Sequence, residues 1–358
     1  MSVEYRACLR ADLAGQRRLF ALSFPETAGS TAASEAHYRW KFEGMPATPA
    51  SWQYVGAEAG TLVAYYAALP YRYRIDGTVR TAAMVCDVMT HPQWRGQGLF
   101  TAIGRHATSQ LAIEGAAFTT GYPIRPEVIP GHLKVGWRVV QPLPVWVRAF
   151  GTRSLLPRAL RWLSPLVDPV LRGLQALLDR PRRGDRSIVQ ERDAFLGESA
   201  YSPAYERFLQ RWMNAVPNAL VKDADFLAWR TGAPGARYAF VSVHRDDELA
   251  ALALVRPTTL KGVRALAVLD IMVDRDQHGA ERSLHHALSR LAVGERCDAV
   301  ACMCSLDWAR AYGFSRAGYL RTPMTFSLIV KPLDPAVTEQ VVGNPGRWHV
   351  FWIDSDDL

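Results

Sequence analysis

The pattern of apolar and polar positions over the first 150 residues predicts an ordered succession of strands and helices. Alternating positions rich in β-branched and aromatic residues predict strands at 3–9, 52–57, 61–75, 78–90, 116–122 and 139–148. Apolar residues spaced three and four apart predict helices at 12–22, 36–43, 99–113 and 131–135. We expect Asp12 to cap the first helix and Asp76-Gly77 to close a hairpin. This order predicts an α+β fold in which helices flank a mixed, mostly antiparallel sheet.

The second half of the chain resembles the first in the order and spacing of its motifs. HYRWKFEGMP at 37–46 is similar to FLAWRTGAP at 226–234, since each places Trp before a basic residue in an aromatic helix. A strand-loop-helix pattern at 267–291 and a Gly-aromatic element at 312–321 follow in the same order. Self-similarity of this kind predicts two related domains in tandem.

The positive charge of the chain is concentrated between the two expected domains. The net charge is +8, and residues 148–186 contribute +6 of it with nine arginines and three aspartates. Leucines and valines recur every three or four residues at 155–179, where Pro165 and Pro169 are expected to divide the segment into short helices. The segment either packs on one domain as a linker or contacts an anionic membrane surface or an acidic partner. We expect domains at 1–150 and 187–332, a linker at 151–186 and a C-terminal tail at 333–358.

Cysteine usage and hydropathy add expectations about class and location. The five cysteines are odd in number and lie in apolar or strand-like surroundings, which predicts reduced thiols in a cytoplasmic protein. Cys302 and Cys304 are two residues apart, but without a second Cys/His pair a buried strand is favoured over a metal site. No apolar run reaches the roughly 18 residues that a membrane-spanning helix needs, and the N-terminal residues lack a signal-peptide core. We therefore expect no metal and no transmembrane segment.

The stretch THPQWRGQGLF, Thr90 to Phe100, joins an expected strand to an expected helix. Gly96 and Gly98 let the backbone approach an anion closely, and the following helix presents free N–H groups and the positive end of its dipole. The loop is neither Gly-x-Gly-x-x-Gly nor a P-loop, because no Gly-Lys-Ser/Thr follows it. Arg95 within the loop adds a cation. The pattern therefore predicts a site for a phosphate-bearing ligand, with a plain strand–turn–helix connection as the alternative.

This loop resembles the pyrophosphate loop of the GNAT N-acetyltransferase superfamily, and the element LKVGWR resembles the Leu-Gly-Phe of that superfamily. The resemblance implies two GNAT-like domains in tandem and coenzyme A, as acetyl-CoA, bound to the first. The pantetheine arm is implied to lie along the strand before the loop, and the pyrophosphate on the loop itself. The implied cofactor-binding residues are Val88, Met89, Thr90, Gln93, Arg95, Gly96, Gln97, Gly98, Leu99 and Phe100.

Acyl transfer to an amine needs a base, and the leaving thiolate can take a proton from an acid. The resemblance points to Asp87 as the base, and burial among apolar neighbours is expected to raise its pKa. The structural alternative is an Asp that caps a turn or pairs with an arginine. His132 stands where the superfamily often has a Tyr, and it is a candidate acid together with Tyr122. The candidate substrate contacts are Tyr38, Trp40, Lys41, Tyr71 and Tyr73, although such an aromatic stripe also suits a core.

The second domain is expected to lack a working cofactor loop, because Asp274 and Asp276 lie where the pyrophosphate would sit. We expect an acetyl-CoA-dependent N-acyltransferase that acts on a small primary amine by direct transfer in a ternary complex. The resemblance suggests an amino sugar or a sugar nucleotide as the amine. Two alternatives stay open: an aminoacyl transferase that uses charged tRNA, and a non-catalytic acyl-CoA-binding module. Nucleic acid is the less favoured partner, because tRNA-dependent relatives typically lack a good coenzyme A loop.

Overall fold

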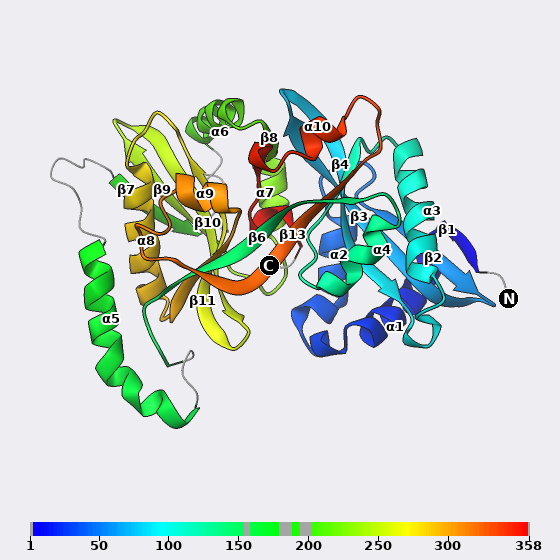
Figure 1. Cartoon of the computed structure of the whole chain (residues 1–358), viewed down its shortest axis with the longest axis horizontal. Helices are drawn as coiled ribbons and strands as arrows, with labels where there is room; N and C mark the ends of the chain where they lie inside the picture. Colours follow the sequence, from blue (N-terminus) through cyan, green and yellow to red (C-terminus); the bar gives the residue numbers. More distant parts are fainter. Residues whose placement is uncertain (1–2, 154–157, 179–187, 194–201, 357–358) are drawn as a thin grey trace. The chain divides into compact units, whose positions relative to one another are not determined.

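A computed structural model describes residues 3–153, 158–178, 188–193 and 202–356 (Figure 1). The chain forms two compact units, each built from several segments of the sequence. Unit 1 comprises Met1–Gln141, Pro217–Gly235 and Ser327–Trp348, and unit 2 comprises Pro142–Val216, Ala236–Phe326 and His349–Leu358. Parts of the expected linker, 154–157 and 179–186, lie outside the described residues.

Unit 1 is a mostly antiparallel sheet with the strand order β1-β2-β3-β4-β5-β13, in which β4 and β5 run parallel. Asp76 and Gly77 join β3 to β4 with φ values of 47° and 88°, as a two-residue hairpin turn requires. The strands are β1 (Glu4–Ala7), β2 (Trp52–Glu58), β3 (Thr61–Ile75), β4 (Thr78–Thr90), β5 (Phe118–Gly121), β8 (Asn218–Leu220) and β13 (Leu320–Pro332). The helices are α1 (Leu13–Ser23), α2 (Glu35–Glu43), α3 (Leu99–Ile113), α4 (Ile129–Leu133), α7 (Ala224–Thr231) and α10 (Glu339–Val342).

Unit 2 repeats this arrangement with the strand order β7-β9-β10-β11-β12-β6, in which β11 and β12 run parallel. Its strands are β6 (Arg138–Ala149), β7 (Ile188–Asp193), β9 (Ala239–Arg245), β10 (Glu248–Leu260), β11 (Val263–Val273) and β12 (Ala299–Met303). Its helices are α5 (Ser164–Leu178), α6 (Pro203–Ala215), α8 (Ala280–Gly294) and α9 (Leu306–Ala311). The matching order of antiparallel and parallel pairs confirms that the chain contains two similar strand arrangements in tandem.

The last strand of each half of the sequence completes the sheet of the other half. Residues 329–332 of β13 pair with β5 in unit 1, and residues 145–149 of β6 pair with β12 in unit 2. Because of this exchange, the compact units differ from the continuous spans 1–150 and 187–332 that the sequence suggested. The expected C-terminal tail also packs into the fold, since Trp348 and Trp352 are fully buried.

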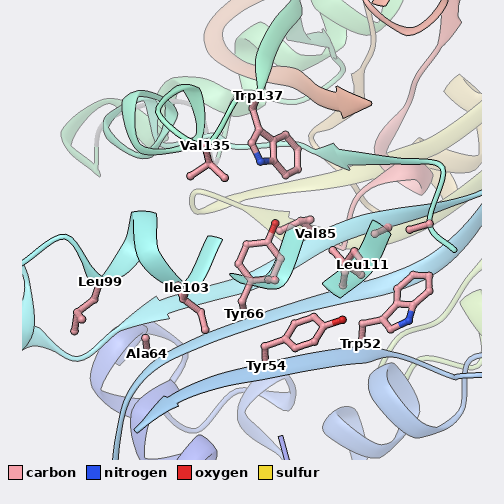
Figure 2. Close-up of a cluster of buried hydrophobic side chains, with 14 of the residues drawn as sticks. Trp52, Tyr54, Ala64, Tyr66, Val85, Leu99, Ile103, Leu111, Val135 and Trp137 are labelled. Atoms are coloured by element: carbon pink, nitrogen blue, oxygen red, sulfur yellow. The ribbon is translucent and has the colours of Figure 1, made fainter. Parts of the chain in front are cut away.

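The core of unit 1 holds α3 against the sheet at the end of β4. Leu99, Ile103, Ala107 and Leu111 recur at four-residue spacing and form one apolar face of α3, which packs in a cluster with Tyr66 of β3 (Figure 2). Gly115, with φ of 89°, follows the end of the helix. This packing fixes the first turn of α3 next to the loop that the sequence singled out.

Three local expectations are corrected by the structure. The carboxylate of Asp12 accepts hydrogen bonds from the Arg6 side chain and the Leu9 N–H, so it closes the preceding 3-10 turn instead of capping α1. The helix expected at 131–135 is α4, which begins two residues earlier. Pro169 lies inside α5 without dividing it, whereas Pro165 lies in the first turn, where the missing N–H has no intrahelical partner to lose.

Candidate active site

The loop between β4 and α3 forms an open turn at a helix N-terminus. Gly96 and Gly98 both have φ of 80°, and, apart from the adjoining residues, no heavy atom of the described part of the chain lies within 4 Å of the position that a Cβ would take on either residue. Gly98 is the N-cap of α3, and the first turn of this helix contains no acidic residue. The turn therefore leaves open space at the first turn of α3, whose N–H groups have no intrahelical partners and lie at the positive end of a helix dipole, as anion binding requires.

Two side chains of the loop fix its shape. The Trp94 indole N–H donates to Glu58 at the end of β2 over 2.7 Å, and its ring meets the His91 ring edge-on with 4.6 Å between centroids. His91 in turn accepts a hydrogen bond from the Gln93 N–H. Trp94 was not among the expected site residues, although it lies inside the motif. Gln93 and Arg95 are exposed, so both side chains are accessible to a ligand on the turn.

The strand that leads into this loop separates from its parallel neighbour. Pairing between β4 and β5 runs from Ala82 with Phe118 to Met84 with Thr120, whereas β4 stays paired with β3 as far as Thr90. Residues 85–90 therefore have no β5 ladder partner in the described structure. The Thr90 hydroxyl is buried and has no hydrogen-bond partner among the described residues. A strand edge that has left its parallel neighbour, next to an anion cradle, suits a ligand with an amide-bearing arm and a pyrophosphate.

Asp87 lies at an irregularity of β4. The register against β3 shifts between Tyr65, which pairs with Met89, and Ala67, which pairs with Cys86. Asp87 itself has φ of 48°, a strained left-handed conformation for a residue other than glycine. Strain at one residue of a strand is typical of functional sites. The bulge breaks the simple alternation from which its burial among apolar neighbours was expected.

Asp87 forms an ion pair with Lys41 of α2. The distance from the Lys41 Nζ to the Asp87 Oδ1 is 3.1 Å, and the two side chains are only 6% and 15% exposed, respectively. The sequence suggested both residues as site candidates but gave them separate roles, as substrate contact and as base. In the structure these two side chains pair with each other. The basic partner of Asp87 is thus a lysine, whereas the alternative of a structural Asp had named an arginine.

A buried polar cluster continues from this ion pair across α2, β2 and β3. The hydroxyls of Tyr38 and Tyr65 both donate to the Gln53 side-chain oxygen, over 2.9 and 2.7 Å. Burial raises the pKa of Tyr38 to about 12. Burial, and then the nearby charges of Tyr38 and Asp87, raise the pKa of Tyr65 well above its ordinary value. Gln53 and Tyr65 were missed from the sequence, because a strand pattern does not show which face meets a polar helix side chain.

His132 is buried between aromatic rings. Its ring meets the rings of Phe100 and Trp137 edge-on, each with 5.0 Å between centroids. Burial lowers the pKa of His132 to about 4, so the side chain is neutral at pH 7. The packing is tight, since a Cβ on Gly131 would lie 2.6 Å from the Phe100 ring. His132 therefore holds the start of α3 against α4 and carries no ionisable proton near neutral pH.

The remaining aromatic candidates are buried in unit 1. The Tyr122 hydroxyl lies 2.9 Å from the Tyr73 hydroxyl. Tyr73 lies opposite Arg80 in the hairpin, and Arg80 is seven residues before Asp87 along β4. The Tyr73 ring packs on Phe118. Tyr71 and Tyr73 have no exposed surface. Tyr71 and Tyr73 pair with Ala82 and Arg80, in the half of β3 away from the glycine turn.

Trp40 and Trp229 form a reciprocal pair within unit 1. Their rings stack at 5.0 Å with an interplanar angle of 11°, and each indole N–H donates to the backbone oxygen of the other residue, over 2.6 and 2.8 Å. The two tryptophans are the matching positions of the similar motifs at 37–46 and 226–234. The contact between equivalent helices confirms the internal similarity and places Trp40 in packing.

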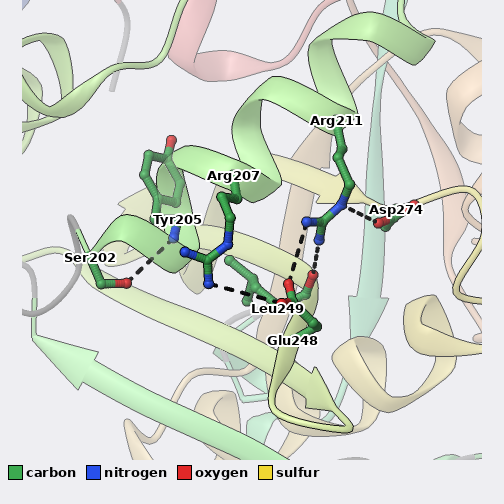
Figure 3. A network of polar contacts seen from close by, with 7 residues as sticks. All are labelled: Ser202, Tyr205, Arg207, Arg211, Glu248, Leu249 and Asp274. Carbon is green, nitrogen blue, oxygen red and sulfur yellow. Dashed lines mark hydrogen bonds and ion pairs between the residues drawn. The ribbon is translucent and has the colours of Figure 1, made fainter.

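The corresponding loop of unit 2 differs in its charges. Gly279 precedes α8 with φ of 86°, just as Gly98 precedes α3, but Glu281 lies in the first turn of α8. Asp274 at the end of β11 accepts a hydrogen bond from the Arg211 Nε over 3.3 Å, in a network with Glu248 (Figure 3). Negative charge at this helix N-terminus opposes a pyrophosphate.

A pocket of about 920 Å³ adjoins the unit 2 loop. Its lining mixes both signs of charge, with three acidic residues and four arginines: Asp246, Asp274, Glu281, Arg245, Arg275, Arg282 and Arg316. The space at this loop is therefore large enough for a ligand, and the acidic residues are the feature that separates it from the loop of unit 1. Within the part of the chain that the structure describes, no cluster of His, Cys, Asp and Glu suits a metal ion.

Comparison with protein families agrees with the geometry of unit 1. Residues 4–140 match the family model described as an acetyltransferase (GNAT) domain. These residues are a GNAT domain. No curated protein sequence matches the chain. None of the helices among the described residues is long and apolar enough to cross a membrane.

Solved structures show that both GNAT-like units belong to one tandem fold. A tandem GNAT protein from the clavulanic acid biosynthesis pathway has a TM-score of 0.61 at 14% identity, over 93% of this chain and 99% of that one. A GCN5-related N-acetyltransferase from Anabaena variabilis has a TM-score of 0.64 at 11% identity, over 93% and 73%. A probable N-acyltransferase from Enterococcus faecalis has a TM-score of 0.65 at 10% identity, with the same coverage. The chain thus has the tandem GNAT fold along most of its length.

Proposed function

We propose that this protein is an acyl-CoA-dependent N-acyltransferase that uses acetyl-CoA and acts on a small primary amine, such as an amino sugar or a sugar nucleotide. The main support is the open turn at Gly96 and Gly98 on the N-terminus of α3, beside the stretch of β4 that has left β5. The cradle has room for phosphate oxygens, and the unpartnered Thr90 hydroxyl offers a buried polar contact among the described residues. Both features fit coenzyme A.

The residues divide the work of binding between backbone and side chains. The N–H groups from about Arg95 to Phe100 would hold the pyrophosphate, and Gln93 and Arg95 would add side-chain contacts. The free edge of β4 at 88–90 would hold the pantetheine amides. When bound, acetyl-CoA supplies an acyl group activated as a thioester. The protein positions this group close to the irregularity of β4 that carries Asp87.

Asp87 takes the proton of the attacking amine, directly or through a water. Lys41 pairs with this carboxylate over 3.1 Å and holds it at the irregularity of β4. Tyr38 and Lys41 would wall the amine site, and Trp40, Tyr71 and Tyr73 would support it through packing. His132 and Tyr122 are not needed as acids, because a thiolate can leave without a proton from the protein.

Calorimetric titration with acetyl-CoA should give about one site per chain, because the second loop carries acidic residues at its helix N-terminus. A free-thiol release assay with amino sugars, sugar nucleotides, amino acids and polyamines would then identify the amine. Two equal sites would contradict the assignment of binding to unit 1 alone. Binding without thiol release for every amine would favour an acyl-CoA-binding module.

His132→Phe should leave kcat within about threefold of the original, whereas loss of a general acid would cost about 100-fold or more. The same variant should change the pH dependence of stability. The unfolded histidine protonates near ~6.5 and the folded one has a pKa of about 4, so the original protein loses stability as the pH falls from about 6.5 to 4. This loss amounts to about 3 kcal/mol and should be absent in the variant, as measured by urea unfolding across that range. A large fall in kcat of His132→Phe at pH 7 would show that His132 takes part in catalysis.

A further inference from the structure

Helix α5 of unit 2 packs through its polar side. Ser164 and Gln175 are buried, with 4% and 7% of their surfaces exposed. The Asp168 carboxylate accepts hydrogen bonds from the Thr152 N–H and hydroxyl, both over 2.7 Å. The Arg148 Nε donates to the Gln175 side-chain oxygen over 2.7 Å. Ser164, Asp168 and Gln175 are spaced four and seven residues apart, so they form one face of the helix.

The opposite face of α5 is apolar and exposed. Leu166, Val170, Leu174 and Leu177 are 67%, 73%, 55% and 53% exposed, and their spacing places them in one stripe. Trp162, in the 3-10 turn that precedes α5, is 69% exposed. A helix on a globular protein ordinarily buries its apolar stripe and exposes its polar side, and α5 does the reverse. A contiguous apolar surface of this kind marks an interaction site.

The charges around the stripe indicate the chemistry of the partner. Arg153 and Arg161 are exposed, whereas Asp168 is turned toward the protein and bonded to Thr152, and the Arg172 Nε donates to the Phe150 backbone oxygen on that side. A second copy of the chain would bring a second set of arginines to the same place, which opposes self-association. An anionic partner with an apolar interior avoids this repulsion.

We propose that α5 binds the surface of a membrane that contains anionic lipids. The stripe would enter the boundary between headgroups and acyl chains, with Trp162 at the interface and the arginines against lipid phosphates. With 15 residues, α5 is about 22 Å long, too short to span a bilayer, so it lies in the plane of the membrane. The inference does not depend on the acyltransferase proposal.

Vesicle sedimentation with the full-length protein tests this proposal. The protein should sediment with vesicles that contain phosphatidylglycerol and much less with pure phosphatidylcholine, and raised salt should release it. Val170→Ser combined with Leu174→Gln should weaken the binding by about tenfold or more. Both side chains are mostly exposed, so the thermal midpoint should not fall.

The matched control is Ile113→Ser combined with Leu320→Gln, which removes two apolar side chains that are 77% and 74% exposed outside α5. This control should bind vesicles like the original protein. Equal binding of the α5 variant and the original would overturn the proposal, and so would failure of the original to sediment with anionic vesicles. Self-association that the α5 variant abolishes, without vesicle binding, would also overturn it and assign the stripe to a second copy.

Discussion

Replacing Asp87 with Asn is expected to lower kcat for acyl transfer by about 100- to 10,000-fold, the usual contribution of a general base. Asn keeps the size of the side chain and one hydrogen-bond acceptor but cannot take the proton. Affinity for acetyl-CoA should change little, because the proposed cofactor contacts are the backbone of 88–90 and the turn after it. Steady-state kinetics and calorimetric titration of the same preparation measure the two effects separately. An unchanged pH–rate profile would remove Asp87 from the mechanism.

The ion pair with Lys41 makes a control for stability necessary. Asp87→Asn leaves the Lys41 ammonium, whose side chain is 6% exposed, without this carboxylate, which should cost about 1–3 kcal/mol of unfolding free energy. The double variant Asp87→Asn with Lys41→Met removes both charges and should recover much of this loss, as urea unfolding would show. Its kcat should stay low. If kcat recovers together with stability, Asp87 acts through the fold and not as a base.

The second half of the chain contains a similar buried pair at the equivalent position. Asp270 of β11 occupies the place in unit 2 that Asp87 occupies in unit 1, beside a register shift between β10 and β11. It is 2% exposed and lies 4.0 Å from the His349 Nδ1. Both units thus place an aspartate close to a basic side chain at a strand irregularity. A buried aspartate with a basic partner is therefore a structural feature that both units share. Kinetics of Asp87 variants would show whether Asp87 also transfers a proton.

Local patterns predicted the elements of unit 1 closely. The strands at 61–75 and 78–90 and the helix at 99–113 have the predicted bounds, because strong alternation, a two-residue turn and a four-residue apolar spacing define them locally. The exchange of β6 and β13 between the sheets could not be predicted in this way. Strand order depends on pairing between distant residues, such as Ala149 with Ala299 and Gly121 with Ile329, about which local periodicity carries no information.

The glycine turn was predictable from the sequence, whereas the surroundings of the other candidates were not. Gly96 and Gly98 reveal the turn because few other residues adopt positive φ easily. The lysine partner of Asp87, the neutral state of His132 and the burial of Tyr71 depend on which distant side chains meet across the sheet. The exposed stripe of α5 was visible as an amphipathic pattern, but the sequence could not show that its polar side faces the protein.

Replacing Gly98 with Trp should reduce affinity for acetyl-CoA by at least about 100-fold, since losing two charge-assisted hydrogen bonds to phosphate is worth roughly 3–6 kcal/mol. The position is open, because, apart from the adjoining residues, no heavy atom of the described part of the chain lies within 4 Å of the place that a Cβ would take, so the indole would fill the space that the ligand needs. Calorimetric titration with acetyl-CoA and with coenzyme A measures the loss. Unchanged affinity would exclude the glycine turn as the pyrophosphate site.

Two matched variants separate lost space from backbone strain. Asn tolerates left-handed φ better than other residues, so Gly98→Asn should keep most of the affinity while it adds a side chain at the same position. Gly279→Trp places the same indole at the equivalent N-cap of α8, where φ is 86°. Binding should survive there, because the acidic residues at that turn already disfavour pyrophosphate. Equal losses from Gly98→Trp and Gly279→Trp would mean that both turns contact the cofactor, and the assignment of one site to unit 1 would fall.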